Sequence, residues 1–404
     1  MPMASGPPIR LLYVCHDPIP SHETRTEQLV QSMSALSAHG FDTTLAIPES
    51  PVPPGPSRSE EIRRFYGLAS DSRFPAAVAH LPPIGGGSAV RLALHDVRAV
   101  RTARHAAFDL VYTRDEFALM VALVNGLPTV FETYRADLNE LRRFWPFRRF
   151  CYSRTNLLGV VAHSRYAMDR FLAAGIDASK VHLAYNGFDP RLFDSAPTRE
   201  QARQTLGLPT DARIVAYTGH VEARKGTDIL LTIAALMPDV LVLLVGALPG
   251  SQGEREFRSE MQRQGVNNVR LVETVDPPAV PVYLAAADCL IVPPTASPLH
   301  QHRRTVLPMK IFAYMAAGRP ILAPDLPDVR EVLVDSQNAV LVQPDQPREA
   351  AAALTALLRD PARAGALGEE ARRQSRACTW ETRAEGLARF LRERLAAHRA
   401  RRQS

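Results

Sequence analysis

Cysteine is scarce in this chain, and its four copies stand far apart. Cys15, Cys151, Cys289 and Cys378 form no C-x-x-C pair, which argues against a structural zinc site. Widely separated thiols suit a reducing compartment, where they remain free and are buried in the core. We therefore expect a cytoplasmic protein.

Long apolar runs are also missing. No segment offers the ~18 uninterrupted apolar residues that a membrane-spanning helix needs, and the apolar run of the N-terminal MPMASGPPIRLLYV is too short for a signal peptide. The sequence therefore predicts a protein that neither spans a membrane nor is exported.

Several ligand-binding motifs are absent as well. The first loop, HDPIPSHETRTEQ, lacks the G-x-G-x-x-G fingerprint, so a dinucleotide is not expected there. We find no D-x-D-like motif and no clustered Asp or Glu spacing, and we therefore expect no metal and no bound cofactor. No recognised nucleic-acid module accompanies the basic residues, so nucleic acid is not an expected partner.

What the chain does have is length, an ordinary soluble composition and one basic end. Its 404 residues, 46% of them hydrophobic, are too many for a single ordinary core, so two domains are expected. From Arg383 onwards, seven arginines face two glutamates, which accounts for most of the net charge of +6. Such a tail could contact an anionic membrane or could be a solvated helix end.

Apolar strands alternate with helical segments along the whole chain, which predicts two doubly wound α/β domains. In the first domain the expected strands are Ile9–Val14, Thr43–Ile47, Asp109–Thr113, Thr129–Glu132, Leu158–Ala162 and Val181–Ala184. A second series begins at Ile214 and continues with Val240–Val245, Val269–Val272, Cys289–Val292, Ile321–Ala323 and Ala339–Val342. The proline- and serine-rich segment 48–60 is expected to be a mobile surface excursion.

We place the domains at 1–190, 191–377 and 378–404, the last being a helix with the basic tail that packs back toward the first domain. The segment 190–211 is polar and contains proline, which is typical of a domain boundary.

The stretch VAYTGHVEARKGTDILL (215–231) is the clearest candidate for anion binding. A strand end leads to Gly219 and His220, then to Lys225 and Gly226, and then to a helix that begins at Thr227. A glycine-containing loop before a helix N-terminus lets backbone N–H groups and the helix dipole face an anion. Taken alone, the stretch is equally typical of an ordinary strand-to-helix turn.

Two further basic segments contain apolar residues. Residues 88–107 carry Arg91, Arg98, Arg101 and Arg104, and residues 142–150 mix Trp145, Phe147 and Phe150 with four arginines. Aromatic and basic side chains together suit a membrane interface, although helices packed on their own domain show the same pattern. Peripheral attachment to the inner face of a membrane is therefore a hypothesis.

An ordered set of motifs resembles the retaining glycosyltransferases of family 4, which have the GT-B fold. The set comprises AHSRYAMDRFLAAGI and YNGFDPRLF, the Gly219 to Gly226 loop, LPMKIFAYMAAGRPIL (307–322), and the EVL…D…N..LV run that begins at Glu331. The resemblance implies two Rossmann-like domains that face a cleft, with the acceptor on the first and a nucleotide diphosphate-sugar donor on the second.

The resemblance also implies roles for individual residues. Lys225 would stabilise the leaving diphosphate, and Tyr134 would stand in the catalytic position where many members have a histidine. Donor contacts would come from a set of seven residues: Gly219, His220, Lys225, Gly226, Thr305, Lys310 and Glu331. Glu132 and Arg135 either contact an acceptor or form a local ion pair.

The chain departs from the family pattern at three positions. His220 replaces an arginine, Tyr134 replaces the histidine, and the glutamate pair of the family falls on Thr305 and Ala313. An alanine cannot hydrogen-bond a ribose hydroxyl, an interaction of about 1.5 to 3 kcal/mol.

We therefore predict a retaining, metal-independent glycosyltransferase that acts on a glycan or glycolipid. The alternative is a catalytically weakened protein of the same fold that binds nucleotide sugars or serves as a scaffold. An epimerase would need paired acids and bases, which we do not find in the sequence.

Overall fold

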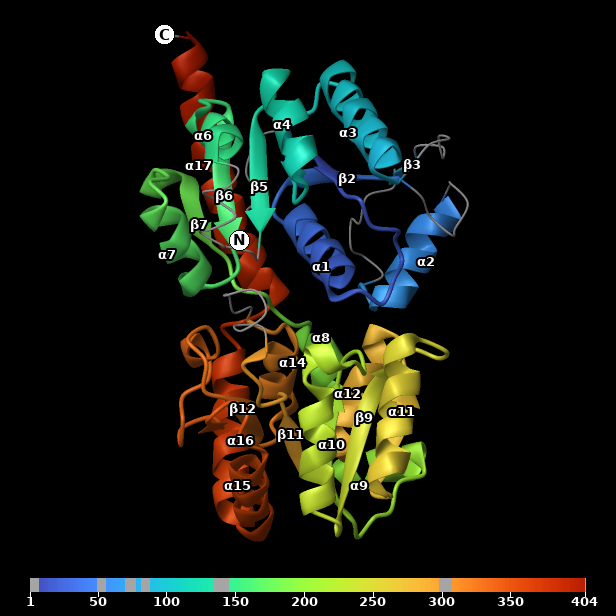
Figure 1. Ribbon diagram of the computed structural model, residues 1–404. Coiled ribbons are helices and arrows are strands. Elements are labelled where there is room, and N and C mark those ends of the chain that lie inside the picture. Colours follow the sequence, from blue (N-terminus) through green and yellow to red (C-terminus); the bar gives the residue numbers. More distant parts are fainter. Residues whose placement is uncertain are drawn as a thin grey trace. The chain divides into compact units, whose positions relative to one another are not determined.

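The computed structural model describes residues 7–48, 56–69, 78–80, 88–133, 145–297 and 307–403. The chain forms two compact units (Figure 1). Unit 1 comprises Met1–Asn186 together with Trp380–Ser404, and unit 2 comprises Gly187–Thr379. The first crossing thus comes at Asn186, a few residues before the expected boundary at 190, and the return comes at Trp380.

Unit 1 contains a parallel sheet of seven strands in the order β3-β2-β1-β4-β5-β6-β7. The strands are β1 (Ile9–Val14), β2 (Phe41–Ile47), β3 (Val78–His80), β4 (Leu110–Thr113), β5 (Thr129–Thr133), β6 (Leu157–Ala162) and β7 (Val181–Leu183). The helices are α1 (Thr24–Ala38), α2 (Pro56–Tyr66), α3 (Ser88–His105), α4 (Glu116–Val124), α6 (Trp145–Ser153), α7 (Arg165–Ala173), the 3-10 turn η1 (Ala178–Lys180) and α17 (Trp380–Gln403).

Both faces of this sheet are covered, as the apolar character of its strands predicts. In β1, Leu11 and Tyr13 belong to a core shared with α1 and α17, whereas Leu12 and Val14 belong to a core shared with α3 and α4. Side chains of a strand alternate between its two faces, so one strand supplies both cores.

Unit 2 contains a parallel sheet of six strands in the order β10-β9-β8-β11-β12-β13. The strands are β8 (Arg213–Thr218), β9 (Val240–Ala247), β10 (Val269–Glu273), β11 (Cys289–Ile291), β12 (Ile321–Pro324) and β13 (Val340–Val342). The helices are α8 (Pro190–Asp194), α9 (Arg199–Leu206), η2 (Ala223–Lys225), α10 (Thr227–Leu236), α11 (Gln252–Gln264), η3 (Pro277–Ala279), α12 (Val280–Ala286), α14 (Lys310–Ala317), η4 (Val329–Glu331), α15 (Pro347–Arg359) and α16 (Pro361–Ser375). The prediction of two doubly wound domains is confirmed.

One local prediction is wrong in part. The segment 48–60 was expected to be a mobile surface excursion, but α2 begins at Pro56. Residues 49–55 lie outside the described residues. Arg58, Ile62 and Tyr66 are all buried, and their spacing of four places them on one helical face. Proline is tolerated in the first turn of a helix, so Pro56 starts α2 and does not prevent it.

Helix α17 packs within unit 1 against α1 and β6 (Figure 1). Its arginines are largely engaged there: Arg392 donates to the His39 carbonyl, Arg394 to the Leu158 carbonyl at 2.8 Å, and Arg399 to Asp109. The tail is therefore not simply a solvated helix end, because these arginines use their positive charges to fix the helix on unit 1.

Candidate functional site

Glycine is required where β8 ends in unit 2. Gly219 has a φ of +138°, and a Cβ atom there would lie 2.8 Å from both the Lys310 amine and the Tyr217 hydroxyl. Any larger residue would therefore push these groups apart. The structure thus brings together Gly219 and Lys310, two residues that the sequence predicted for one site.

The next glycine fixes the start of α10. Gly226 has a φ of +77° and is the N-cap of the helix, and a Cβ atom there would lie 2.5 Å from Thr295 Cγ2 and 2.9 Å from Pro293 Cβ. With no side chain, Gly226 cannot accept the first N–H groups of α10. These donors, with the positive end of the helix dipole, are the local elements of an anion site.

Two amines lie close to this loop. Lys225 is exposed, and Lys310, at the start of α14, holds its Nζ 3.8 Å from the centroid of the Tyr217 ring. Burial, and then the charge of Lys225, lower the pKa of Lys310 well below its ordinary value. Neither lysine forms an ion pair with any residue of the described part of the chain, so a bound anion would favour the charged form of Lys310.

Tyrosines hold the loop from inside the unit. The Tyr217 hydroxyl donates to the His220 carbonyl at 3.0 Å, and the Tyr314 hydroxyl accepts from the Thr218 N–H at 2.8 Å. Both rings are fully buried. Neither tyrosine was predicted as a site residue, because Tyr217 belongs to an apolar strand and Tyr314 was seen as one residue of the 307–322 motif.

The other residues predicted to contact the donor lie farther along the chain from the Gly219–Gly226 loop, or lie outside the described residues. Glu331 lies in η4, which follows β12 at the carboxyl edge of the sheet, where loops of doubly wound domains bind ligands. Ala313 lies partly exposed on α14. Thr305 lies outside the described residues, and so does the candidate catalytic residue of unit 1, Tyr134. Arg135 is also outside them.

Arg224 differs from its neighbour Lys225. Both are exposed in η2, but the Arg224 guanidinium lies 2.7 Å from the Glu222 carboxylate. Of the two basic residues in this turn, Lys225 is the one whose charge no neighbouring carboxylate balances.

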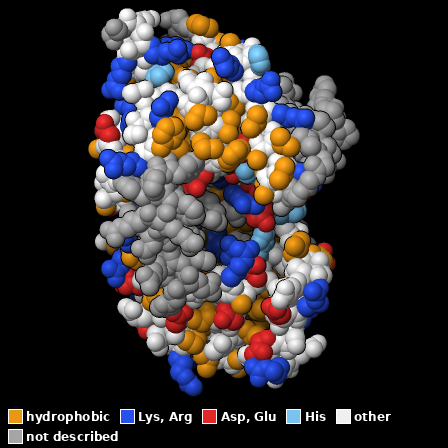
Figure 2. All heavy atoms as spheres, turned by 45° about the horizontal axis from the view of Figure 1, so that its top comes forward, with side chains coloured by type: hydrophobic (Ala, Val, Ile, Leu, Met, Phe, Trp, Pro, Cys, Tyr) orange, Lys and Arg blue, Asp and Glu red, His pale blue; other side chains and the backbone are white. Residues whose placement is uncertain are grey.

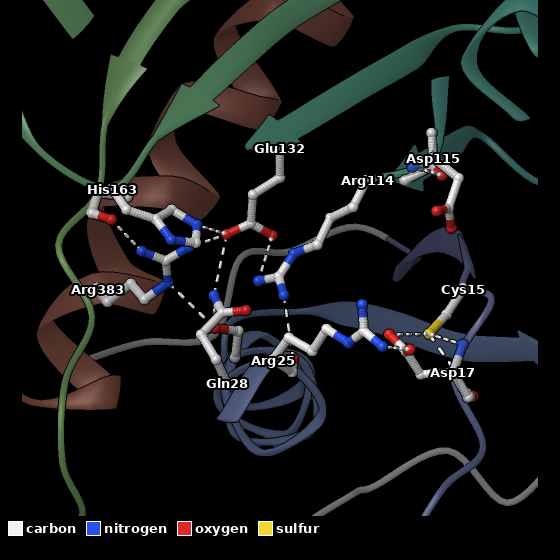
Figure 3. Close-up of polar contacts among 12 residues, drawn as sticks. Cys15, Asp17, Arg25, Gln28, Arg114, Asp115, Glu132, His163 and Arg383 are labelled. Carbon is white, nitrogen blue, oxygen red and sulfur yellow. Dashed lines mark hydrogen bonds and ion pairs between the residues drawn. The ribbon is translucent and has the colours of Figure 1, made fainter. Parts of the chain in front are cut away.

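Unit 1 has a charged cluster of its own at the carboxyl edge of its sheet (Figure 3). The Glu132 carboxylate at the end of β5 accepts from His163 Nε2 at 2.6 Å, from Gln28 Nε2 at 2.9 Å and from Arg383 of α17. Arg114 Nη2 lies 3.5 Å from its second oxygen. Of the two readings offered for Glu132, an acceptor contact or a local ion pair, this geometry favours the ion pair.

The negative charge of Glu132 is balanced within the protein. Burial alone would raise the pKa of Glu132, but the positive charges of Arg114 and Arg383 hold it well below its usual range. Burial lowers the pKa of His163 to about 4, so the ring is neutral at neutral pH and its Nε2–H donates to the carboxylate. Arg383 also donates to the Ala184 and Tyr185 carbonyls, which ties α17 to the end of unit 1.

A histidine between two carboxylates follows β1. His16 Nε2 lies 2.8 Å from Asp96 Oδ1, and its Nδ1 lies 3.1 Å from Asp115 Oδ1. Burial alone would lower the pKa of His16, but the hydrogen bond with Asp96 and the charge of Asp115 raise it. The contacts join the first loop to α3 and to the start of α4, which the order of motifs in the sequence did not reveal.

Searches for two other kinds of site gave no candidate in the described ranges. No group of three or more His, Cys, Asp or Glu side chains there is arranged to hold a metal ion. Within the same ranges, no helix is both long and apolar enough to cross a bilayer.

Comparison with known families gives two matches that share the chain between them. Residues 23–192 match the model of Glycosyltransferase Family 4, and residues 198–374 match the model of Glycosyl transferases group 1. The second match includes the Gly219–Gly226 loop, Lys310 and Glu331.

Curated relatives resemble about half of the chain. The D-inositol 3-phosphate glycosyltransferase of Xylanimonas cellulosilytica is 30% identical over 221 residues, which cover 53% of this chain and 51% of the relative. The protein of the same name from Thermobispora bispora is 30% identical over 227 residues, with coverages of 54% and 51%. The chain thus spans about half the length of the curated relatives it matches.

Solved structures resemble nearly the whole chain in fold. A sucrose-phosphate synthase from Thermosynechococcus elongatus has a TM-score of 0.77 at 19% identity, covering 96% of this chain and 100% of its own. Anabaena Alr3699/HepE, crystallised with UDP and glucose, has a TM-score of 0.74 at 20% identity, with coverages of 95% and 100%. At these identities the likeness establishes the fold alone.

Proposed function

This chain belongs to the group 1 glycosyltransferases of family 4 and has their GT-B fold, and from that premise we propose that it transfers a sugar from a nucleotide diphosphate donor to a glycan or glycolipid acceptor. We propose further that the sugar keeps its anomeric configuration, as in the retaining enzymes that the motifs resemble. Unit 2 binds the donor, and unit 1 binds the acceptor.

The observation that carries the donor proposal is the pair of amines beside the uncapped start of α10. The leaving diphosphate gains negative charge as the glycosidic bond breaks, so groups that stabilise this charge lower the barrier. Lys225, Lys310 and the first N–H groups of α10 supply positive charge at one place without a metal ion. Crystals of Alr3699/HepE with UDP-glucose show that one protein of this fold binds such a donor.

The other site residues take supporting roles in this proposal. Gly219 and Gly226 allow the diphosphate to approach the backbone, and His220 lies beside it on the same loop. Glu331 contacts the nucleotide from η4 after β12, which lies two strands from β8 in the sheet. The contributions of Thr305 to donor binding and of Tyr134 to catalysis stay predictions, as does a cytoplasmic location on the inner face of a membrane.

A second candidate function is nucleotide-sugar binding without efficient transfer. It rests on Ala313, which occupies a position where the family has a glutamate that holds the donor ribose. The partly exposed Ala313 side chain offers no hydrogen bond to a hydroxyl group.

A donor panel distinguishes the two functions. We expect one member of a set of UDP-, GDP- and ADP-sugars to bind in calorimetry and to be hydrolysed or transferred, with the product linkage determined by NMR. Binding without turnover favours the second function, and a gain of turnover in Ala313→Glu would then identify the missing group. If no donor binds and none is turned over, both functions are excluded.

A further inference from the structure

Three neighbouring helices of unit 1 present apolar side chains to solvent. α3 packs against α4, and α4 packs against α6. The exposed apolar residues on them are Val90, Leu94, Phe117, Val124 and Phe150, with Val90 and Val124 each 55% exposed. Figure 2, which turns the top of Figure 1 forward, shows hydrophobic side chains gathered on this side of unit 1 with basic side chains around them. We refer to these residues and the arginines beside them as the α3–α4–α6 face.

Along α3 the exposed side chains change from apolar to basic. Val90, Leu94, Arg98 and Arg101 are all exposed, and their spacing places them in one stripe. Arg104 continues the basic end of the stripe, and Arg149 adds a charge on α6. The apolar end of the stripe can therefore insert into an apolar layer, and its basic end can contact anions.

These arginines remain available to a partner. Arg98, Arg101 and Arg104 form no ion pair with any residue in the described part of the chain, and Glu116 is the one exposed acidic residue on the described side chains of the three helices. The basic tail differs, because Arg383, Arg392, Arg394 and Arg399 are bound to unit 1. Within the described residues, Arg98, Arg101 and Arg104 therefore differ from the paired arginines of α17.

We infer that the α3–α4–α6 face binds the surface of an anionic lipid membrane. The free energy falls when exposed valine, leucine and phenylalanine side chains enter the interface between headgroups and acyl chains. It falls further when arginines contact the lipid phosphates nearby. A nucleic acid would satisfy the arginines but would leave the aliphatic side chains in water. Exposed apolar side chains gathered on one side of a protein, with polar groups around them, are typical of an interaction surface.

Vesicle flotation tests the inference without donor or acceptor. We expect wild-type protein to float with vesicles of phosphatidylglycerol and phosphatidylcholine, to float much less with phosphatidylcholine alone, and to be released by salt. The triple variant Arg98→Glu, Arg101→Glu, Arg104→Glu is expected to lower the partition coefficient at least about tenfold. The matched control, Arg401→Glu with Arg402→Glu at the exposed end of α17, is expected to bind like wild type.

A second variant tests the apolar part of the face. Val90→Ser with Val124→Ser leaves the charges intact. Because both side chains are exposed, the two changes are not expected to unfold the protein. We expect this variant to bind at low salt and to dissociate at a lower salt concentration than wild type. Circular dichroism and donor binding of each variant show that a loss of flotation is not a loss of folding or of the donor site.

Four results would overturn the inference. They are absence of wild-type binding to the anionic vesicles, wild-type flotation by the triple arginine variant, an equal loss in the α17 control, and a dimer in solution that Val90→Ser with Val124→Ser dissociates. The last result would make this face an interface between two copies of the chain. Donor binding would be unaffected by any of the four, so the proposed glycosyl transfer stands or falls separately.

Discussion

Both units have a cluster of charged residues at the carboxyl edge of their sheet, but Glu132 of unit 1 is paired whereas Lys225 and Lys310 of unit 2 are, among the described residues, unpaired. In unit 1, buried Glu132 is surrounded by His163, Gln28 and Arg383, which all hydrogen-bond to it. In unit 2, Lys225 and Lys310 lie near one another with no carboxylate paired to either in the described part of the chain. The carboxylate of the first cluster already has its ion-pair partners in the folded protein, whereas the second cluster would gain from an added anion.

This difference separates a structural cluster from a binding site. Ligands of doubly wound domains bind at the carboxyl edge of the parallel sheet. Both clusters lie at such an edge, so their position alone does not show which of them binds a ligand. A buried charge that is already paired gives a ligand nothing to neutralise and is costly to break. A buried amine beside a second amine has a lowered pKa, and an anion relieves that repulsion.

The largest expected effect is on the unit 1 cluster. Glu132→Ala leaves Arg383 buried without its carboxylate, and breaking a buried pair in this way costs about 3 to 5 kcal/mol. Both tryptophans of the chain, Trp145 and Trp380, belong to unit 1. Urea unfolding followed by tryptophan fluorescence therefore reports the loss in this unit.

An exposed pair supplies the control. Glu385→Ala removes the partner of Arg389 on the surface of α17, which also belongs to unit 1, where a loss within about 0.5 kcal/mol is expected. Equal losses in Glu132→Ala and Glu385→Ala would contradict the view that the unit 1 cluster is structural.

Acid should weaken unit 1 through the same cluster. The pKa of His163 is about 4 in the folded protein and about 6.5 when unfolded. The unfolded chain therefore binds more protons below pH 6.5, and stability is lost as the pH falls from there toward 4. The lowered pKa of Glu132 acts in the same direction at still lower pH. Between pH 7 and 4.5, His163 alone should account for about 2.5 kcal/mol.

His163→Gln isolates this contribution. His95 and His182 also have pKa values lowered to about 4 by burial, so wild-type acid sensitivity has several sources. The variant should show a pH dependence that is shallower by roughly 2 kcal/mol over the same range. An unchanged pH dependence of the urea unfolding free energy would show that the pKa of His163 is the same in the folded and the unfolded chain.

The contrast between the clusters also shows what sequence could predict. Near-continuous apolar strands and the Gly219–Gly226 loop are local patterns, and the structure has β8, η2 and α10 where those patterns place them. The pairing of Glu132 with Arg383 joins residues 251 positions apart. No local pattern specifies such a pair, so the sequence left a binding role and a structural role open both for Glu132 and for the arginines of the tail.

Within unit 2 the same limit applies to one residue. Lys310 was predicted from its motif and its place at a helix start, but its approach to the Tyr217 ring depends on how α14 packs on β8. The helices α15 and α16 were not predicted, because alanine-rich segments without a functional motif received no assignment. These features depend on how the helices pack, which the hydrophobic periodicity of the sequence does not specify.

Gly226 provides a smaller and more local test of the open site. Gly226→Ala would place Cβ 2.5 Å from Thr295 Cγ2 in a left-handed backbone conformation, so a loss of about 2 kcal/mol or more is expected. Gly207, at a φ of +58°, has open space around it, and Gly207→Ala should cost about 1 kcal/mol. Thermal unfolding in the two variants compares the two costs. A donor that binds Gly226→Ala as well as wild type would show that the start of α10 is not part of the site.

Lys225→Ala is the change expected to matter least for folding and to separate the two clusters most cleanly. The side chain is exposed and unpaired in the described part of the chain, so the free energy of unfolding should stay within about 0.5 kcal/mol of wild type. Donor Kd should rise about tenfold, which corresponds to about 1.4 kcal/mol. Arg224→Ala, one position earlier and already paired with Glu222, should leave donor Kd nearly unchanged. Calorimetry on both variants decides the matter, since equal effects would mean that net charge, and not the unpaired position of Lys225, attracts the diphosphate.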